Sequence, residues 1–263
     1  MKLVIVNQSV EIFDERFENR SVQKYMGTKL CYSSDMNQYE ECNKWKVLTN
    51  GEELYIDKKM KTIILPSGVT VEEVCFVIRV LFDCILILNG VCPLHASLVA
   101  RENQQIVIVA KSGEGKSYQC EQISKMDNSF VVCGDDHIYI DENKIYGNKY
   151  SRKRTVNGDI YCDIPLGTCD NNNLICLGIK FENENFSKKS NDVMYLRKLS
   201  GLKYIAPTFN LKGKTYSIFS YFGNDIIECY ESILKKYMKK LFIIHGKKDY
   251  IFKAIMSLIR NDL

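Results

Sequence analysis

The sequence predicts an α/β protein built on a mixed sheet, and three observations support this fold class. An apolar run, IVIVA at residues 106–110, leads into a short glycine-containing loop that ends in Gly-Lys-Ser and opens a helical pattern. Strand-like and helix-like runs then follow one another without strict β-α-β alternation, which is typical of a mixed sheet. Polar turns between apolar runs, as in HIYIDENKIYG at residues 137–147, indicate antiparallel hairpins. We therefore expect an α/β domain from about residue 90 onward.

Residues 1–69 predict a small β-rich N-terminal lobe that packs against a second domain of residues 70–263. The dipeptide Asn50-Gly51 stands between the strand-like runs KWKVLT and ELYIDKKMKTIILP. Asn-Gly is a strong signal for a two-residue hairpin turn. We therefore expect a β-hairpin centred on Asn50-Gly51.

A long buried helix is predicted to follow the lobe. Thr70 is a suitable N-cap, acidic residues fill the first turn, and Gly90 marks the end. The segment is apolar on most faces, which indicates a largely buried helix. It also contains Arg79 and Asp83, which a membrane span would rarely tolerate together.

The rest of the chain alternates between strand and helix patterns. They predict strands within residues 93–110 joined by a polar turn at 101–104, a helix at 117–125, a strand at 130–136, a hairpin at 137–147, a strand at 174–181, and helices at 225–240 and 249–260. The polar, basic stretch at residues 148–173 is too long for an ordinary connection. We therefore expect it to be a functional loop.

Composition narrows the function classes. The net charge of +4 is far from the basic footprint of a dedicated nucleic-acid binder. Eleven cysteines without regular spacing do not resemble a secreted disulfide scaffold, so we interpret them as reduced thiols. The N-terminal residues lack a signal-peptide pattern. A soluble cytoplasmic protein without a membrane partner is expected.

Residues 110–117 form the strongest motif and are called the phosphate loop below. The Walker A pattern is G-x-x-x-x-G-K-[ST], and this chain departs from it only at Ala110, which replaces the first glycine by one methyl group. Glycines let successive N–H groups point into an anion-binding nest, the lysine places a charge on the terminal phosphates, and the serine offers a hydroxyl to Mg²⁺. The residues predicted to bind the phosphates are Lys111, Ser112, Gly113, Glu114, Gly115, Lys116 and Ser117.

Two further elements flank the phosphate loop. His95 lies on the strand before it, and Asp135 and Asp136 follow the next strand after it. Two carboxylates at a strand end can divide labour, one ligating Mg²⁺ and the other taking a proton from an attacking hydroxyl. Taken alone, the aspartates also fit an ordinary turn and His95 fits a core histidine. Their joint placement around the phosphate loop favours a site.

The order Leu-His-Ala-Ser, strand, phosphate loop, helix, strand and Gly-Asp-Asp-His resembles the catalytic domain of the HPr kinase/phosphorylase superfamily. That fold is shared with PEP carboxykinase, whose His-Cys-Ser and Gly-Asp-Asp-Glu-His motifs are similar. The closest likeness is to small HPr-kinase-related proteins of peptide-modification systems, including lasso-peptide kinases. The resemblance covers roughly residues 72–145 and implies a PEP-carboxykinase-like P-loop domain behind the β-rich lobe.

The resemblance also implies roles for single residues. Asp135 would be the base toward the acceptor hydroxyl, Asp136 with Ser117 would hold the metal, and His95 would lie near the metal or the transferred phosphate. Lys116 would stabilise the charge on the transferred phosphate. The oxaloacetate-binding arginines of carboxykinases have no counterpart, and the signature that follows the two aspartates in true HPr kinases is not recognisable. Neither carboxykinase chemistry nor HPr as the substrate is therefore expected.

A basic run, Arg152-Lys153-Arg154, lies soon after the predicted hairpin. A guanidinium there could clamp the γ-phosphate or an acidic substrate, and Arg154 is the candidate we choose. The other interpretation of this run is a solvated basic loop.

Two function classes fit these residues. The first is an ATP- and Mg²⁺-dependent kinase that phosphorylates a hydroxyl, with a serine of a peptide or small protein preferred over a small molecule. The second is a regulatory module that senses ATP without transferring phosphate. Retention of His95, Asp135 and Asp136 beside the phosphate loop favours the kinase, because a sensor needs the phosphate cradle but not the base. A homo-oligomer, a reverse phosphorylase activity and the nucleotide preference are left open.

Overall fold

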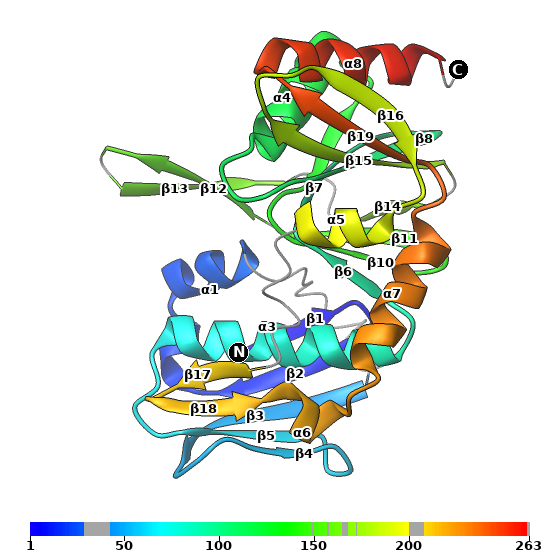
Figure 1. Ribbon diagram of the computed structural model, residues 1–263. Coiled ribbons are helices and arrows are strands. Elements are labelled where there is room, and N and C mark those ends of the chain that lie inside the picture. Colours follow the sequence, from blue (N-terminus) through cyan, green and yellow to red (C-terminus); the bar gives the residue numbers. More distant parts are fainter. Residues whose placement is uncertain are drawn as a thin grey trace.

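The computed structural model describes residues 1–28, 43–148, 150–156, 158–164, 168–171, 173–199 and 208–261. It confirms a mixed α/β architecture with several sheets (Figure 1). An N-terminal sheet carries a long helix, a small sheet lies in the middle, and a six-stranded sheet with helices forms the other end. The helices of the described residues are α1 (Arg20–Gly27), α3 (Val71–Leu88), α4 (Lys116–Met126), α5 (Val193–Leu199), α6 (Ile218–Phe222), α7 (Ile226–Tyr237) and α8 (Lys248–Asn261). The four predicted helices are confirmed as α3, α4, α7 and α8, whereas α1, α5 and α6 were not predicted.

The N-terminal sheet has the strand order β1-β2-β3-β5-β4. Its strands are β1 (Lys2–Ile5), β2 (Gln8–Phe13), β3 (Asn43–Gly51), β4 (Tyr55–Asp57) and β5 (Thr62–Pro66). Strand β3 pairs in parallel with both β2 and β5, while β4 pairs only with β5 at the edge. The β-rich character is confirmed, but the hairpin centred on Asn50-Gly51 is wrong, because the strands on either side of it are not partners.

Gly51 is required by a close approach to the neighbouring strand. A Cβ atom at this position would lie 2.5 Å from Ile64 Cγ2 and 3.2 Å from the Leu65 carbonyl oxygen. The ladder between β3 and β5 also shifts register between Leu48 and Gly51. A glycine in a strand often marks such a bulge or close contact, and this use produces the same Asn-Gly dipeptide as a turn does.

Helix α3 begins at the N-cap Thr70 that the sequence predicts, and Thr70 and Glu73 form a capping box there. Thr70 Oγ1 accepts a hydrogen bond from the Glu73 amide at 3.1 Å, and Glu73 Oε2 accepts one from the Thr70 amide at 2.8 Å. The helix lies on the N-terminal sheet (Figure 1), where Phe82 meets Trp45 edge to face at 5.8 Å. Of the helices in the described ranges, none has the length and apolarity needed to cross a bilayer.

The six-stranded sheet has the order β16-β19-β15-β8-β7-β9. Its strands are β7 (Ala96–Arg101), β8 (Gln104–Val109), β9 (Val131–Gly134), β15 (Leu174–Phe181), β16 (Phe186–Ser190) and β19 (Leu241–Gly246). The three central strands β8, β15 and β19 are parallel, and β7, β9 and β16 run antiparallel to their neighbours. The mixed sheet is therefore confirmed, although β16 and β19 were not predicted.

Side chains of the central strands alternate between two hydrophobic cores. On β8, Ile106 and Ile108 belong to the core shared with α4 and α8, as does Ala110 directly after the strand, whereas Val107 and Val109 belong to the core shared with α3, α5 and α7. This period of two is the geometry of a strand buried on both faces.

The small middle sheet has the order β14-β11-β10-β6. Its strands are β6 (Cys92–Leu94), β10 (Ile138–Ile140), β11 (Lys144–Gly147) and β14 (Thr168–Asp170). The hairpin of β10 and β11 confirms the prediction for residues 137–147. The functional loop expected at 148–173 is instead a two-stranded antiparallel hairpin, β12 (Tyr150–Thr155) with β13 (Gly158–Asp163), followed by β14. The sequence did not show these strands, because YSRKRT and GDIYCD have no regular alternation of polar and apolar residues.

The chain returns to the N-terminal sheet near its end. The hairpin of β17 (Thr208–Leu211) and β18 (Lys214–Ser217) lies beside this sheet together with α6 (Figure 1). Lys214 forms an ion pair with Glu53, and the Lys212 amide donates to Glu73 Oε1 at 3.4 Å. The predicted boundary between a lobe of residues 1–69 and a domain of residues 70–263 stays a prediction. Residues 208–222 lie beyond this boundary in the sequence, yet they share one core with the N-terminal sheet.

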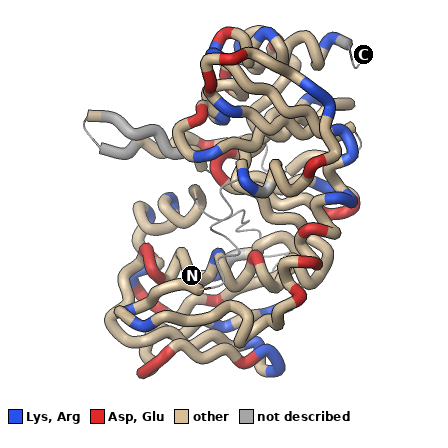
Figure 2. Tube along the Cα trace, in the orientation of Figure 1, with Lys and Arg blue, Asp and Glu red and all other residues tan. Residues whose placement is uncertain are grey.

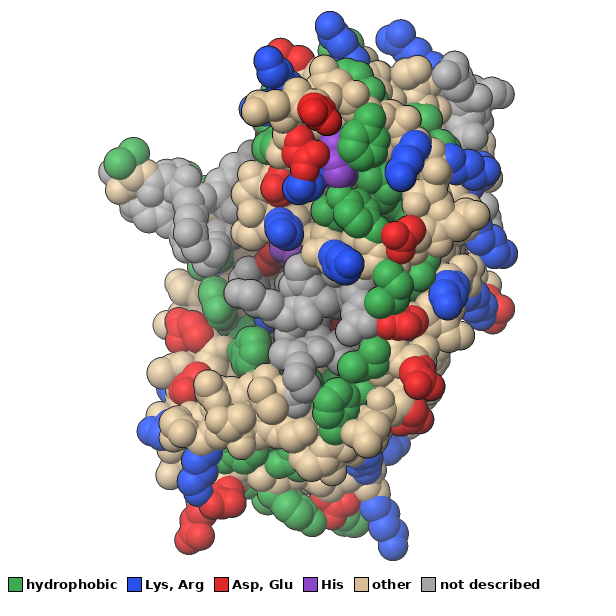
Figure 3. Space-filling view, viewed as in Figure 1, with side chains coloured by type: hydrophobic (Ala, Val, Ile, Leu, Met, Phe, Trp, Pro, Cys, Tyr) green, Lys and Arg blue, Asp and Glu red, His purple; other side chains and the backbone are tan. Residues whose placement is uncertain are grey.

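Basic and acidic residues are interspersed along the described chain (Figure 2). In the face shown by the space-filling view, hydrophobic side chains also lie between basic and acidic ones (Figure 3). This pattern agrees with the small net charge of +4.

We expect Gly51→Ala to destabilise the protein by about 1–3 kcal/mol, because the new methyl group overpacks the contact with Ile64. Urea unfolding measures this change. Ile64→Ala removes the clashing methyl, so Gly51→Ala should cost much less in that background. An equal cost in both backgrounds would contradict the close-approach explanation.

Candidate active site

The phosphate loop connects β8 to α4 and has the backbone of an anion-binding nest. Gly113 and Gly115 have φ values of 88° and 78°, a region that glycine enters without strain. Gly115 is the N-cap of α4, and no side chain caps the first turn. The amides of that turn are therefore open to an anion, which the helix dipole also favours. Ala110 is fully buried in the core and is not among the described residues with positive φ, so its methyl group introduces no strain.

The loop is supported from the end of β15. A Cβ atom on Gly115 would lie only 2.9 Å from Cζ of the Phe181 ring, so that the ring packs directly against this glycine. The Phe181 amide donates a hydrogen bond to Glu114 Oε2 at 2.6 Å. This contact turns the Glu114 carboxylate toward β15 and binds the loop to the parallel part of the sheet.

Lys116 is a buried cation at the centre of the site, with 7% of its surface exposed. Its Nζ lies 3.1 Å from the Ala110 carbonyl oxygen and 3.3 Å from His95 Nε2. Burial lowers the pKa of the Lys116 ammonium, and the carboxylates of Asp136 and Asp135 oppose part of this shift. Lys116 thus carries its charge against a desolvation cost that an anionic ligand would relieve.

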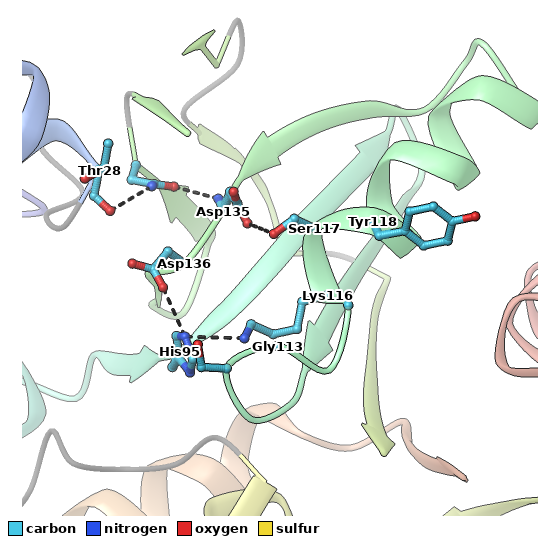
Figure 4. A pocket seen from close by; sticks show the side chains of 11 residues that line it. Thr28, His95, Gly113, Lys116, Ser117, Tyr118, Asp135 and Asp136 are labelled. Atoms are coloured by element: carbon cyan, nitrogen blue, oxygen red, sulfur yellow. Dashed lines mark hydrogen bonds and ion pairs between the residues drawn. The ribbon is translucent and has the colours of Figure 1, made fainter. Parts of the chain in front are cut away.

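Asp135 gathers hydroxyl groups from two elements. Its Oδ1 accepts hydrogen bonds from Ser97 of β7 at 2.8 Å and from Ser117 of α4 at 2.5 Å. Figure 4 shows the contact with Ser117. Its backbone amide donates to Asn148 Oδ1 at 2.6 Å. The carboxylate is therefore fixed beside the serine that the motif assigns to the metal.

Asp136 has a strained backbone and a different partner. Its φ of 77° lies in the left-handed region, where a side chain costs about 1–2 kcal/mol. Its Oδ1 lies 3.0 Å from His95 Nε2 (Figure 4). Strain of this kind often accompanies function.

His95 stands between Asp136 and Lys116. The same ring nitrogen, Nε2, lies 3.0 Å from Asp136 Oδ1 and 3.3 Å from Lys116 Nζ. One nitrogen cannot donate to the carboxylate and accept from the ammonium at the same time. The position of a single proton therefore decides which of the two neighbours His95 binds.

A cavity of about 270 Å³ lies between these groups. It is lined by Thr28, His95, Ser112, Gly113, Gly115, Lys116, Ser117, Tyr118, Asp135, Asp136 and Asn148. Eight residues predicted from the sequence are thus brought together. Lys111 and Glu114 belong to the loop but are not among the lining residues. The side chain of Arg154 lies outside the described part of the structure, so its predicted role remains a prediction.

Sequence reasoning missed Asn148 and Thr28. Asn148 is fully buried, accepts from the Asp135 amide, and donates to the carbonyl oxygens of Thr28 at 3.3 Å and Tyr150 at 2.9 Å. It thereby connects the turn that contains Asp135 and Asp136, called the acidic turn below, to the end of α1. An asparagine within a polar stretch gives no signal of this role, because the contact joins residues 120 positions apart.

His245, to which the sequence assigns no partner, belongs to a cluster at the ends of β15 and β19. Its Nδ1 lies 2.9 Å from Glu182 Oε2, and its Nε2 lies 2.6 Å from the Tyr195 hydroxyl. Burial lowers the pKa of His245, and Lys180 and Lys188 add to the shift. Since Glu182 follows Phe181, this cluster adjoins the support of the phosphate loop.

Comparisons with known proteins add little to this site. No protein-family model matches the chain, and no curated protein matches it in sequence. Among solved structures, the chain is similar to the HPr(Ser) kinase/phosphatase from Coxiella burnetii, with a TM-score of 0.33 and 11% identity, over 65% of this chain and 95% of that chain. Because this similarity is weak, the residues of the site carry the functional conclusion. The resemblance to the HPr kinase superfamily stays an expectation drawn from the motifs.

The left-handed backbone at Asp136 predicts an unusual order of stabilities. Both Asp136→Gly and Asp136→Ala remove the carboxylate, but only glycine adopts this φ freely. We expect Asp136→Gly to be more stable than Asp136→Ala by about 1 kcal/mol in urea unfolding. The same pair at Asp135, which is not among the positive-φ residues described, should show no such advantage for glycine. A more stable alanine variant at position 136 would contradict the strained conformation.

Proposed function

We propose that this protein is an ATP-dependent phosphotransferase that acts on a hydroxyl group, most fittingly a serine of a peptide or small protein. One observation carries the proposal: a buried lysine and a serine at the start of α4, a histidine between β6 and β7, and two carboxylates in the turn after β9 surround one cavity. Phosphoryl transfer needs mainly positioning and charge stabilisation, which this set of groups can supply.

The backbone of the phosphate loop supports binding of a nucleoside triphosphate. The uncapped first turn of α4 and the two positive-φ glycines leave backbone donors for phosphate oxygens. Lys116 Nζ is held by the Ala110 and Lys111 carbonyl oxygens, at 3.1 and 3.4 Å. From that position it can exchange carbonyl contacts for the more strongly charged terminal phosphates.

A divalent metal is supported by the donor set at Ser117. Mg²⁺ commonly uses one or two carboxylates together with waters and substrate phosphates, and it neutralises charge on the transferred group. Within the described residues, no three His, Cys, Asp or Glu side chains form a complete metal site. The 2.5 Å contact of Ser117 favours Asp135 as the carboxylate at the metal. The sequence-based assignment gave this role to Asp136.

Asp136 is then the better candidate for the proton acceptor. Its carboxylate faces His95 rather than the loop serine, at 3.0 Å. A hydroxyl entering the cavity opposite the phosphate loop would give its proton to Asp136, while Lys116 stabilises charge on the phosphate side. His95 Nε2 can then bind either Asp136 or Lys116, depending on whether this nitrogen carries a proton.

The proposal predicts phosphate transfer that depends on the loop. Incubation of a peptide and metabolite pool with the protein, ATP and Mg²⁺ should add about 80 Da to one acceptor by mass spectrometry, the mass of one phosphoryl group. Lys116→Met, which keeps an unbranched side chain one atom shorter and removes the charge, should abolish the gain. ATP binding without any transfer would contradict the kinase and favour the ATP-sensing module.

The two aspartates should respond differently to neutralisation. Asp136→Asn should lower kcat by about 10²- to 10⁴-fold, the usual contribution of a general base, and leave the Mg²⁺ requirement unchanged. Asp135→Asn should instead raise the Mg²⁺ concentration needed for half-maximal rate. Steady-state kinetics over a Mg²⁺ series separates these results. If Asp135→Asn loses only kcat and Asp136→Asn only Mg²⁺ affinity, the sequence-based roles are the right ones.

A further inference from the structure

A third aspartate, Asp83, lies outside the cavity. Asp83 of α3 is fully buried, with 0% exposed surface, in a helix that is otherwise apolar on this face. Its Oδ1 accepts a hydrogen bond from the Tyr139 hydroxyl at 2.7 Å and lies 3.2 Å from His137 Nε2. His137 is 1% exposed and meets the Tyr139 ring edge to face at 4.7 Å.

This arrangement is a poor way to gain stability. Removing a carboxylate from water is costly, and buried ion pairs are often no more stable than apolar replacements of similar size. The second oxygen, Asp83 Oδ2, has no hydrogen-bond partner among the described residues. An apolar residue at this point of α3 would avoid the cost, so a different role is indicated.

The position of His137 indicates that role. His137 follows Asp136 directly, and the next residue, Ile138, pairs with Leu94, which precedes His95. His95 therefore adjoins one end of this ladder, and only His137 separates Asp136 from the other strand, so that the contact between Asp136 and His95 lies next to the ladder. Because Asp83 holds the imidazole of His137, the backbone of the neighbouring Asp136, with its left-handed φ, has less freedom to rotate.

We propose that Asp83 is a positioning residue, which fixes His137 and thereby holds Asp136 against His95. It touches neither the cavity nor any reacting group, and it acts from the helix that covers the N-terminal sheet. The kinetic consequence rests on the proposed phosphotransferase function, whereas the structural consequence does not.

Histidine NMR spectra test the structural consequence directly, since the chain has only three histidines. In Asp83→Asn, a near-isosteric change, the imidazole signals of both His137 and His95 should shift, and that of His245 should not. The kcat for phosphate transfer should fall about 10- to 100-fold, as for other residues that orient site groups. Nucleotide affinity without Mg²⁺ should stay that of the wild type.

A matched control is Gln8→Met, which removes another buried hydrogen bond, the one that Gln8 accepts from Trp45 Nε1 at 3.2 Å. It should leave all three histidine signals and kcat unchanged. A second pair avoids dependence on the folding of Asp83→Asn: His137→Gln keeps a donor toward Asp83, and His137→Leu does not. Only the leucine variant should shift His95 and lower kcat.

The proposal is overturned if folded Asp83→Asn leaves the His95 signal and kcat at their wild-type values, or if His137→Gln and His137→Leu behave alike. If the wild-type protein transfers no phosphate, the kinase proposal fails on its own. The His95 signal then still decides whether Asp83 positions the turn.

Discussion

The antiparallel pairing of β7 with both β8 and β9 is the constraint on which the site depends. It sets Ala96 opposite Val109 and Leu98 opposite Gly134, so that the start of β7 and the ends of β8 and β9 meet at one edge of the sheet. The phosphate loop, the acidic turn and the residues around His95 therefore converge without any long connection. Ser97 is an example, because from β7 it donates to the Asp135 carboxylate, which also accepts a hydrogen bond from Ser117 of the phosphate loop. This edge holds the loop that follows a parallel strand, a common place for ligands in α/β sheets.

Several features at this edge are unfavourable for stability, and they lie close together. Lys116 is a buried cation, Asp136 has a left-handed backbone, and Asp83 is a carboxylate without exposure. Burial of polar groups and backbone strain each cost free energy that folding must offset elsewhere. The two large hydrophobic cores on either face of the six-stranded sheet supply that stability. Two of these costs, at Lys116 and Asp136, fall on residues that line one cavity, which is typical of a functional site.

The sequence predicts what is encoded locally and fails where distant residues decide. Thr70 with Glu73, and the loop from Ala110 to Ser117, carry their own signals, and both were found. The Asn50-Gly51 pair was misinterpreted because Ile64, on another strand, is the reason for the glycine. The site shows the same limit: the sequence named His95, Asp135 and Asp136, but it could not show which carboxylate meets Ser117. Asn148 and Asp83 were missed as contributors because their contacts cross from one element to another.

The central claim is that the loop at residues 110–117 binds nucleotide phosphates next to a metal held by the acidic turn. Calorimetric titration of the wild-type protein with ATP, with and without Mg²⁺, tests it most directly. We predict measurable ATP binding that Mg²⁺ strengthens, because Ser117 and a neighbouring carboxylate would share the ion with the phosphates. Absence of ATP binding in both conditions, or affinity that Mg²⁺ leaves unchanged, would contradict the account.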